Sequence, residues 1–284
     1  LAKQTHGGYK VYSADLGQGA DDRLALQGEL RQAIANHELV LHFQPKIDFT
    51  ANRVHGVEAL VRWQHPKHGL LAPDKFIPLA EQTGLIKALT YQVLRSALQQ
   101  CEEWQRGGLD LSMSVNISAI NIQDPEFPAQ VAALLKEFTV SPAHLELEVT
   151  ETAVMAEPVR AVACIKKLSA LGLQIAIDDF GTGYSSMSYL KDLLVAKIKI
   201  DKSFVKDMAV NHNDAVIVRS TVELGHNLGL KVVAEGVETE AVWDRLKALG
   251  CDDAQGYYMS RPLPLDKFTE WLQQSPWGLK TTSN

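Results

Sequence analysis

The chain has 284 residues, of which 46% are hydrophobic and 22% are charged, a composition typical of a globular protein with a large core. Its length fits one large α/β domain or two ordinary domains. The net charge of −6 argues against general nucleic-acid binding, which usually needs a basic face, so we expect no DNA or RNA polymer as a partner.

Cysteine spacing and hydropathy restrict the class further. Cys101, Cys164 and Cys251 are far apart and form no C-x-x-C pair, so we expect neither a zinc site nor a disulfide framework, and a reducing compartment is favoured. No apolar run reaches the roughly 18 residues of a membrane span, and no signal peptide is visible. We therefore expect no membrane contact from this chain, which begins at Leu1 and reads as a fragment of a longer protein.

Apolar, β-rich runs alternate with amphipathic helical patterns along the chain. Glycines at 172, 229 and 250 follow three of the helical patterns, as expected of helix C-caps. About eight strands alternating with helices predict an α/β fold of the (β/α)8 barrel type, with a doubly wound sheet as the alternative. The predicted strands are 40–43, 54–63, 111–117, 145–150, 174–177, 197–200, 231–234 and 253–255, and the predicted helices are 85–104, 126–138, 157–171, 213–228 and 240–249.

Polar side chains recur where the predicted strands end, and in a barrel this is the edge that carries the active site. One acid after a strand is unremarkable, but acids and amides after successive strands would make a strongly anionic site that needs cations to neutralise it. The donors are oxygens without Cys or His, which favours hard divalent ions. The residues concerned are Glu58, Asn116, Glu146, Glu148, Glu151, Asp178, Asp179, Lys199, Asp201, Glu235, Glu238 and Gln255.

The number of these donors favours two ions rather than one. Mg²⁺ usually takes only one or two carboxylates, so the set exceeds the needs of a single ion. Two Mg²⁺ or Mn²⁺ ions would use it, with one carboxylate as a bridge, and such sites activate water for phosphodiester cleavage. Lys199 is then expected to orient or deprotonate the water, or to neutralise developing charge.

Asp178 and Asp179 pose a geometric question, because neighbouring side chains of a strand point to opposite faces. We expect the strand to end at Asp178, so that alternation no longer applies and Asp179 lies in the following Gly-Thr-Gly turn. Both carboxylates can then reach the same place.

The motifs together resemble the EAL domain, the phosphodiesterase of cyclic di-GMP. The resemblance covers roughly residues 24–273, and the motifs occur in the order of the family. They are QPK at 44–46, EALVRW at 58–63, FIPLAE at 76–81, NIS at 116–118, EVTE at 148–151, DDFGTGYSS at 178–186, KIKID at 197–201, AEGVE at 234–238 and QGYYMSRP at 255–262.

This resemblance implies a modified TIM barrel with one antiparallel strand near the start, two Mg²⁺ or Mn²⁺ ions, and hydrolysis of cyclic di-GMP to linear pGpG. It implies that Lys199 holds the attacking water with Asp201 nearby, that Glu151 anchors the loop 180–186, and that Glu238 is an outer acid. We expect Asp201 to be structural, as an ion-pair partner of Lys199. It also implies a bacterial cytoplasmic protein, a homodimer formed near the loop after Asp179, and a full-length protein that other domains can tether to a membrane. The implied metal ligands are Glu58, Asn116, Glu148, Asp178, Asp179 and Glu235, and the implied substrate contacts are Gln44, Arg62 and Gln255.

The resemblance also sets the expected domain limits. Residues 1–22 are expected to hold the tail of an upstream GGDEF-like domain and a linker, 23–274 the EAL barrel, and 275–284 a polar, frayed tail. Lys46 and Asp48 stand where the family usually has apolar residues, and we expect neither to touch a proposed ligand. For Tyr257 and Tyr258 a packing role is favoured, with base stacking as the alternative.

Two other functions fit part of the pattern. The first is a receptor of the same fold that binds cyclic di-GMP without hydrolysing it, although the usual marks of that class, lost ligands or a disrupted loop, are not seen. The second is a metal-dependent barrel of the enolase type, which expects a Lys or His base opposed across one metal. The adjacent Asp178 and Asp179 and the loop FGTGYSS fit that class poorly.

Overall fold

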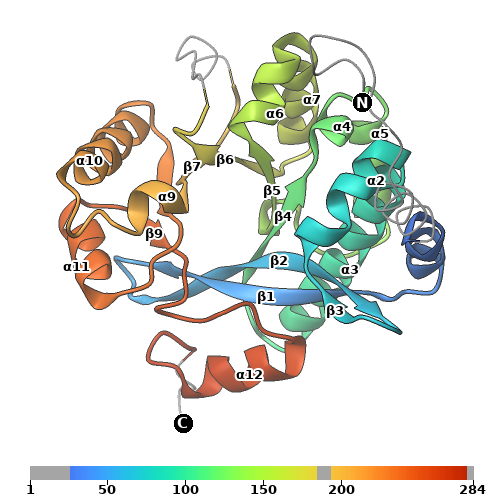
Figure 1. The fold of residues 1–284 in the computed structure, drawn as a ribbon, viewed down its shortest axis with the longest axis horizontal. Helices are drawn as coiled ribbons and strands as arrows, with labels where there is room; N and C mark the ends of the chain where they lie inside the picture. Colours follow the sequence, from blue (N-terminus) through green and yellow to red (C-terminus); the bar gives the residue numbers. More distant parts are fainter. Residues whose placement is uncertain (1–25, 184–192, 280–284) are drawn as a thin grey trace, which may run out of the picture.

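The strands form a closed barrel in the computed structural model, which describes residues 26–183 and 193–279 (Figure 1). Within these residues, one nine-stranded sheet has the order β1-β9-β8-β7-β6-β5-β4-β2-β3, and β1 also pairs with β2. Since β3 extends the sheet beyond β2, the other strands make the ring. The strands are β1 Leu39–Asp48, β2 Arg53–His65, β3 Gly69–Leu71, β4 Ser112–Ile117, β5 Leu145–Thr150, β6 Gln174–Phe180, β7 Lys197–Ile200, β8 Lys231–Ala234 and β9 Asp253–Ala254.

Helices surround this ring and connect its parallel strands (Figure 1). A first helical stretch covers residues 26–35. Within the described residues, no helix combines the length and the apolar character that crossing a bilayer requires. The helices that follow residues 26–35 are η2 Pro73–Lys75, α2 Ile77–Thr83, α3 Ile86–Arg106, α4 Ala119–Ile122, α5 Phe127–Leu135, η3 Pro142–His144, α6 Glu151–Ala156, α7 Pro158–Ala170, α9 Lys202–Val205, α10 His212–Asn227, α11 Glu240–Ala248 and α12 Leu265–Gln274.

The predicted α/β barrel is confirmed, and ring closure excludes the doubly wound sheet. Strand β1 runs antiparallel to both of its neighbours, β2 and β9, as the resemblance implies. It extends to Asp48, well beyond the predicted strand 40–43. Asp48 begins the turn to β2, where its Oδ1 accepts a hydrogen bond of 2.7 Å from Ala51 N, and Asn52 supplies a left-handed residue with φ 49°. Asp48 therefore stabilises the turn between β1 and β2.

Helix α12 covers the outer face of the β1–β2 hairpin (Figure 1), where a short turn replaces the usual crossover helix. Its Phe268 is fully buried and lies 6.0 Å from Phe43, centroid to centroid. The expectation of a frayed tail from residue 275 is wrong for 275–279. The carbonyl of Trp277 accepts a hydrogen bond of 2.8 Å from Val54 N, and its ring packs against Trp243.

The barrel interior is charged, whereas the apolar core lies between the strands and the helices. Inward-facing positions of a barrel are usually filled by branched apolar residues. Here the inward side chains include Lys46, Glu146, Glu148, Lys199 and Asp253, all buried. Outward-pointing residues of the barrel strands form the core, among them Val57, Leu147, Ile175, Ile198 and Val232. A buried charge needs a partner, so these side chains are expected to form pairs with one another.

Candidate active site

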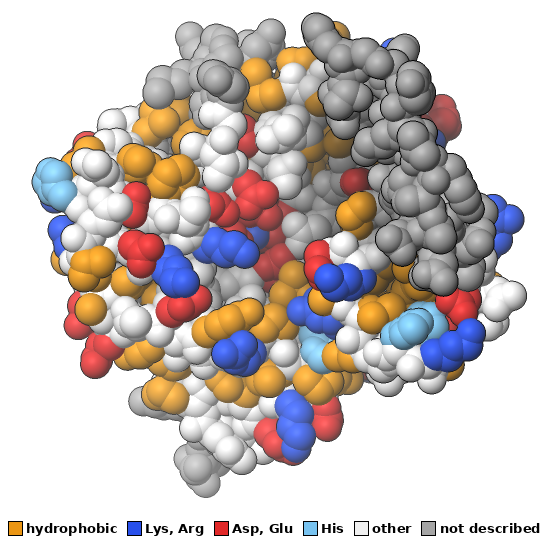
Figure 2. Space-filling view, in the orientation of Figure 1, with side chains coloured by type: hydrophobic (Ala, Val, Ile, Leu, Met, Phe, Trp, Pro, Cys, Tyr) orange, Lys and Arg blue, Asp and Glu red, His pale blue; other side chains and the backbone are white. Residues whose placement is uncertain are grey.

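The polar strand ends meet in a hollow at the centre of one face of the molecule. Figure 2 shows acidic side chains gathered in this hollow, over the mouth of the barrel. The cavity has a volume of about 290 Å³. Its lining includes Gln44, Glu58, Asp178, Glu235, Glu238, Gln255 and Tyr257. Six of these seven residues are ones that the sequence places in the site, and they lie on or shortly after five different strands.

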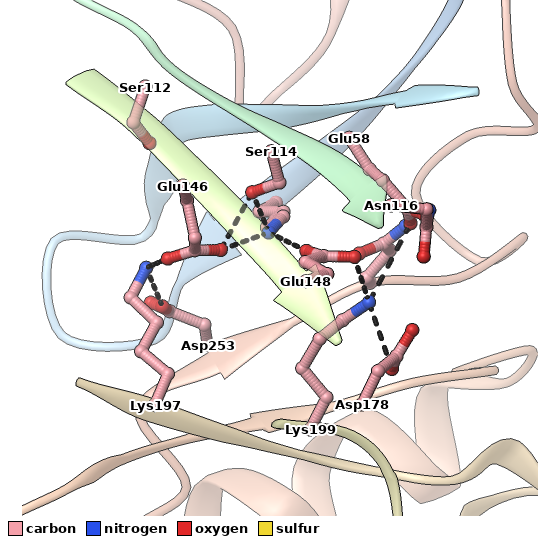
Figure 3. A network of polar contacts seen from close by, with 12 residues as sticks. Glu58, Ser112, Ser114, Asn116, Glu146, Glu148, Asp178, Lys197, Lys199 and Asp253 are labelled. Atoms are coloured by element: carbon pink, nitrogen blue, oxygen red, sulfur yellow. Dashed lines mark hydrogen bonds and ion pairs between the residues drawn. The ribbon is translucent and has the colours of Figure 1, made fainter. Parts of the chain in front are cut away.

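Lys199 lies at the centre of the carboxylates (Figure 3). It is fully buried, and its position on β7 directs the side chain into the barrel. Its Nζ is 2.5 Å from Glu148 Oε2 and 2.6 Å from Glu235 Oε1. It is also 3.1 Å from Asp178 Oδ1 and 3.9 Å from Glu58 Oε2. One ammonium therefore contacts carboxylates from four different strands or strand ends.

Two amides orient the carboxylate of Glu58. Asn116 Nδ2 donates to Glu58 Oε1 over 2.5 Å, and Gln255 Nε2 donates to Glu58 Oε2 over 2.5 Å. The same Gln255 nitrogen donates to Gln44 Oε1 over 3.0 Å, and Gln44 Nε2 donates to the carbonyl of Ser260. Two of the predicted metal ligands, Glu58 and Asn116, thus form one hydrogen-bonded group with the predicted substrate contacts Gln44 and Gln255.

Asp178 and Asp179 reach the same place, but the expected reason is wrong. Strand β6 continues to Phe180 instead of ending at Asp178. Asp179 adopts a left-handed conformation with φ 53°, and the register with β7 shifts between Ile177 and Phe180. Aspartate is one of the few residues that tolerate this conformation. The local twist, rather than the end of the strand, breaks the alternation and brings both carboxylates to the cavity side.

The residues predicted around the metal ligands, Glu151, Glu238 and Arg62, differ in burial and in their partners. Glu151 is buried, and its Oε2 accepts a hydrogen bond of 3.0 Å from Gly181 N, at the start of the loop whose residues 184–192 lie outside the described residues. Glu238 is exposed at the cavity rim. Arg62 is half-buried, and its Nη1 donates to its neighbour Val61 O over 2.9 Å.

Asp201 does not pair with Lys199 among the ion pairs of the described residues, contrary to the expectation. It caps helix α9, where its Oδ1 accepts a hydrogen bond of 2.9 Å from Ser203 N. Its negative charge lies close enough to Asp179 to raise the pKa of that carboxyl.

The crowding of acids shows in their pKa values. Burial, with the charges of Asp178 and Asp201, raises the pKa of Asp179 to about 6. Burial likewise raises the pKa of Glu235 to about 8, although Lys199 opposes the shift. Burial alone would lower the pKa of Lys199, but Asp178, Glu148 and Glu235 hold it well above its usual range. The cluster has more negative groups than one ammonium balances, so additional cations would stabilise it.

The donor set fits hard divalent ions. Oxygens of Asp178, Asp179 and Glu235 lie within 4.8 Å of one another, so a single ion can contact all three. Gln255 Oε1 is buried and has no hydrogen-bond partner within the described residues, which leaves one more oxygen for a ligand. Carboxylate and amide oxygens are the donors that Mg²⁺ and Mn²⁺ prefer.

The sequence-based expectation that Lys46 touches no proposed ligand is wrong. Lys46 Nζ lies 2.6 Å from Glu148 Oε1 and 2.7 Å from Glu146 Oε1, and it also donates to Ser114 Oγ. Further from the mouth, Lys197 Nζ lies 2.9 Å from Glu146 Oε2. A signal existed in the sequence: Lys46 alternates with Gln44 on the inner face of β1.

Tyr257 and Tyr258 differ although they are adjacent. Tyr258 packs against Trp243 and Trp277, as expected. Tyr257 is 50% exposed and lines the cavity, and the Arg261 guanidinium lies 4.3 Å from its ring centroid. The expected packing role is therefore correct for Tyr258 and wrong for Tyr257.

Comparison with known proteins identifies the family. Residues 27–262 match the EAL domain. The chain belongs to the EAL domain family. The EAL match covers all of the strand-end residues described above, from Gln44 to Gln255.

Curated relatives of this EAL domain are much longer than the chain. The bifunctional diguanylate cyclase/cyclic di-GMP phosphodiesterase MucR of Pseudomonas aeruginosa is 43% identical over 265 residues, which cover 93% of this chain and 39% of MucR. The cyclic di-GMP phosphodiesterase NbdA of the same organism is 40% identical over 265 residues, which cover 93% of this chain and 34% of NbdA. The chain thus spans less than half of the length of either protein.

Solved structures of EAL domains share the fold. The structure described as the PaMucR phosphodiesterase in complex with c-di-GMP has a TM-score of 0.83 and 44% identity, and the match covers 86% of this chain and 99% of that one. The FimX EAL domain from Pseudomonas aeruginosa bound to c-di-GMP has a TM-score of 0.78 and 26% identity, with coverage of 85% and 96%.

Proposed function

We propose that this chain is a metal-dependent phosphodiesterase that hydrolyses cyclic di-GMP to linear pGpG. The observation that carries the proposal is the convergence of carboxylates from several strands on the buried Lys199, in an open cavity at the barrel mouth. The similarity to MucR and NbdA, both named as acting on cyclic di-GMP, supports the choice of substrate.

We propose two Mg²⁺ or Mn²⁺ ions as cofactors. Glu58, Asn116, Glu148 and Asp178 would hold one ion, and Asp178, Asp179 and Glu235 the other. When bound, such ions neutralise phosphate charge and lower the pKa of a water ligand.

The chain's own groups would position the reactants. The Lys199 ammonium would hold the attacking water, because no other ammonium among the described residues contacts Glu148, Asp178 and Glu235 together. The water oxygen would bond to phosphorus as one P–O3′ bond breaks, and the leaving O3′ would take up a proton from the water, which opens the ring. Gln44, Arg62 and Gln255 would contact the dinucleotide at the rim, Glu151 would fix the loop through Gly181, and Asp201 and Glu238 would act from the periphery.

The test is incubation of the purified chain with cyclic di-GMP and Mg²⁺ or Mn²⁺, with pGpG followed by chromatography. We expect pGpG to accumulate with both ions and to stop forming in EDTA. Tight binding of cyclic di-GMP without product under both ions would contradict the enzyme and leave the receptor function.

Ca²⁺ is expected to inhibit turnover in the presence of Mg²⁺. It takes six to eight oxygens at longer distances, about 2.3–2.6 Å against 2.0–2.1 Å for Mg²⁺, so it would bind the carboxylates without holding them in the geometry that Mg²⁺ demands. The measurement is the initial rate of pGpG formation as Ca²⁺ is titrated at constant Mg²⁺. Undiminished turnover as Ca²⁺ rises at constant Mg²⁺ would argue against a tight two-metal site.

The organisation of the longer protein also stays a prediction. We propose that residues 23–274 form the EAL unit of a bacterial cytoplasmic protein, with 1–22 belonging to a GGDEF-like domain and linker. Residues 1–25 lie outside the described residues. We also propose a homodimer, formed near the loop after Asp179. Sedimentation equilibrium of the chain at micromolar concentration tests this, and a strictly monomeric mass would reject it.

A further inference from the structure

Lys46 is a buried cation in direct contact with the proposed metal site. It is 1% exposed and projects from β1 into the barrel. Its ammonium has three partners, Ser114 Oγ, Glu146 Oε1 and Glu148 Oε1, which match its three donor hydrogens. Since every donor is engaged by a buried group, the ammonium has one well-defined position.

Glu148 is consequently held from two sides. Lys46 contacts its Oε1 at 2.6 Å. Lys199 contacts its Oε2 at 2.5 Å (Figure 3). The two oxygens of Glu58, in contrast, are held by Asn116 and Gln255, which belong to the predicted site themselves. Lys46 is thus a group outside the predicted set that constrains one of its carboxylates.

We propose that Lys46 is a positioning residue that fixes the Glu148 carboxylate in the orientation needed to bind a divalent ion. This proposal rests on the proposed function. Outer partners that orient a ligating carboxylate typically change metal affinity or activity by about 10- to 100-fold when removed. Lys46 does not face the cavity, so its effect on substrate would pass through Glu148.

A simple charge effect predicts the opposite result. Removal of a positive charge beside an anionic site would, by electrostatics alone, strengthen the binding of a cation. Loss of orientation would weaken it, because Glu148 would be free to turn away from the ion. The direction of the change in metal affinity therefore separates the two roles.

Lys197→Met is the matched control for Lys46→Met. Lys197 also projects into the barrel and also pairs with Glu146, at Oε2, but it lies on the side away from Glu148. Both substitutions remove one ammonium from Glu146 and keep a long apolar side chain. Only Lys46→Met removes a contact from Glu148.

The experiment measures Mn²⁺ affinity by calorimetry on the metal-stripped chain, together with kcat and KM for cyclic di-GMP. For Lys46→Met we expect Mn²⁺ affinity about 10- to 100-fold weaker and a lower kcat, with KM changed by less than about threefold. For Lys197→Met we expect lower thermal stability but Mn²⁺ affinity within about threefold of the unsubstituted chain. Unchanged or tighter Mn²⁺ binding by Lys46→Met would overturn the proposal, as would an equal weakening in both variants.

Two further comparisons keep the test decisive. If Lys46→Met does not fold, Ser114→Ala removes one partner of the ammonium and should weaken Mn²⁺ binding in the same direction, whereas unchanged affinity would count against positioning. If the unsubstituted chain binds Mn²⁺ but forms no pGpG, the proposed function fails while the positioning role is still decided by the affinities.

Discussion

Glu58→Gln is expected to reduce the turnover of cyclic di-GMP by at least about a thousandfold, which corresponds to about 4 kcal/mol of transition-state stabilisation. Glu58 is buried, and both of its oxygens accept hydrogen bonds from amide nitrogens, those of Asn116 and Gln255. A glutamine would present its own N–H to one of these donors. Either that amide or its partner would have to turn, and the site would lose a negative charge as well.

Pseudo-first-order rates of pGpG formation at saturating Mg²⁺ measure this effect. Binding of cyclic di-GMP, followed by calorimetry in Ca²⁺, should persist in Glu58→Gln. Glu223→Gln is the control, because Glu223 is exposed on the outer helix α10 and should leave the rate unchanged. If Glu58→Gln kept a tenth or more of the activity, Glu58 would not be a metal ligand.

Lys199→Met is expected to affect both stability and chemistry. The substitution removes the cation that contacts Glu148, Asp178 and Glu235, and it leaves buried acids uncompensated. Loss of one partner from a buried ion pair typically costs about 3–5 kcal/mol. Loss of the group that holds the water is expected to lower kcat by about 10²- to 10⁴-fold.

Divalent ions should separate these two effects. In EDTA, urea unfolding should show the full loss of stability, and saturating Mn²⁺ should restore part of it because the ion replaces the missing positive charge. Turnover should stay low in the same Mn²⁺. Recovery of both stability and turnover with Mn²⁺ would reduce Lys199 to a charge-balancing role. Lys197→Met, two residues earlier on the same face of β7, should lose stability with a smaller effect on turnover.

Local pattern was sufficient to predict the order of the barrel strands and five of the helices between them. The alternation of apolar runs with amphipathic segments predicted the barrel, because each element must bury one face against the next. Strand β3 was missed, β1 was predicted too short, and the helical stretch 26–35 and helices α2, α4, α6, α9 and α12 were not predicted. The inward half of β1 reads as polar, with Gln44 and Lys46, because the interior of this barrel holds charges rather than aliphatic side chains.

The residues at the strand ends can be predicted to lie close together, because parallel strands of one barrel bring their carboxyl ends to the same edge. That property predicts that Glu58, Glu148, Asp178 and Glu235 belong to one site. The sequence does not predict which of these side chains pair with one another. Which oxygen of Glu148 faces Lys46, and which faces Lys199, depends on the register of strands far apart in the chain.

The sequence by itself determined the fold class, the oxygen-only donor set and the strands that carry it, because periodicity and residue chemistry are local properties. The tertiary structure alone decided that Asp179 adopts a left-handed conformation within β6 and that Asp201 caps α9 instead of pairing with Lys199. It also decided that Lys46 contacts Glu148. The contact between Lys46 and Glu148 depends on barrel closure, which brings β1 and β5 to one buried network where each charge needs a partner. The conformation of Asp179 and the cap made by Asp201 are set by the local backbone, which residue types alone do not fix.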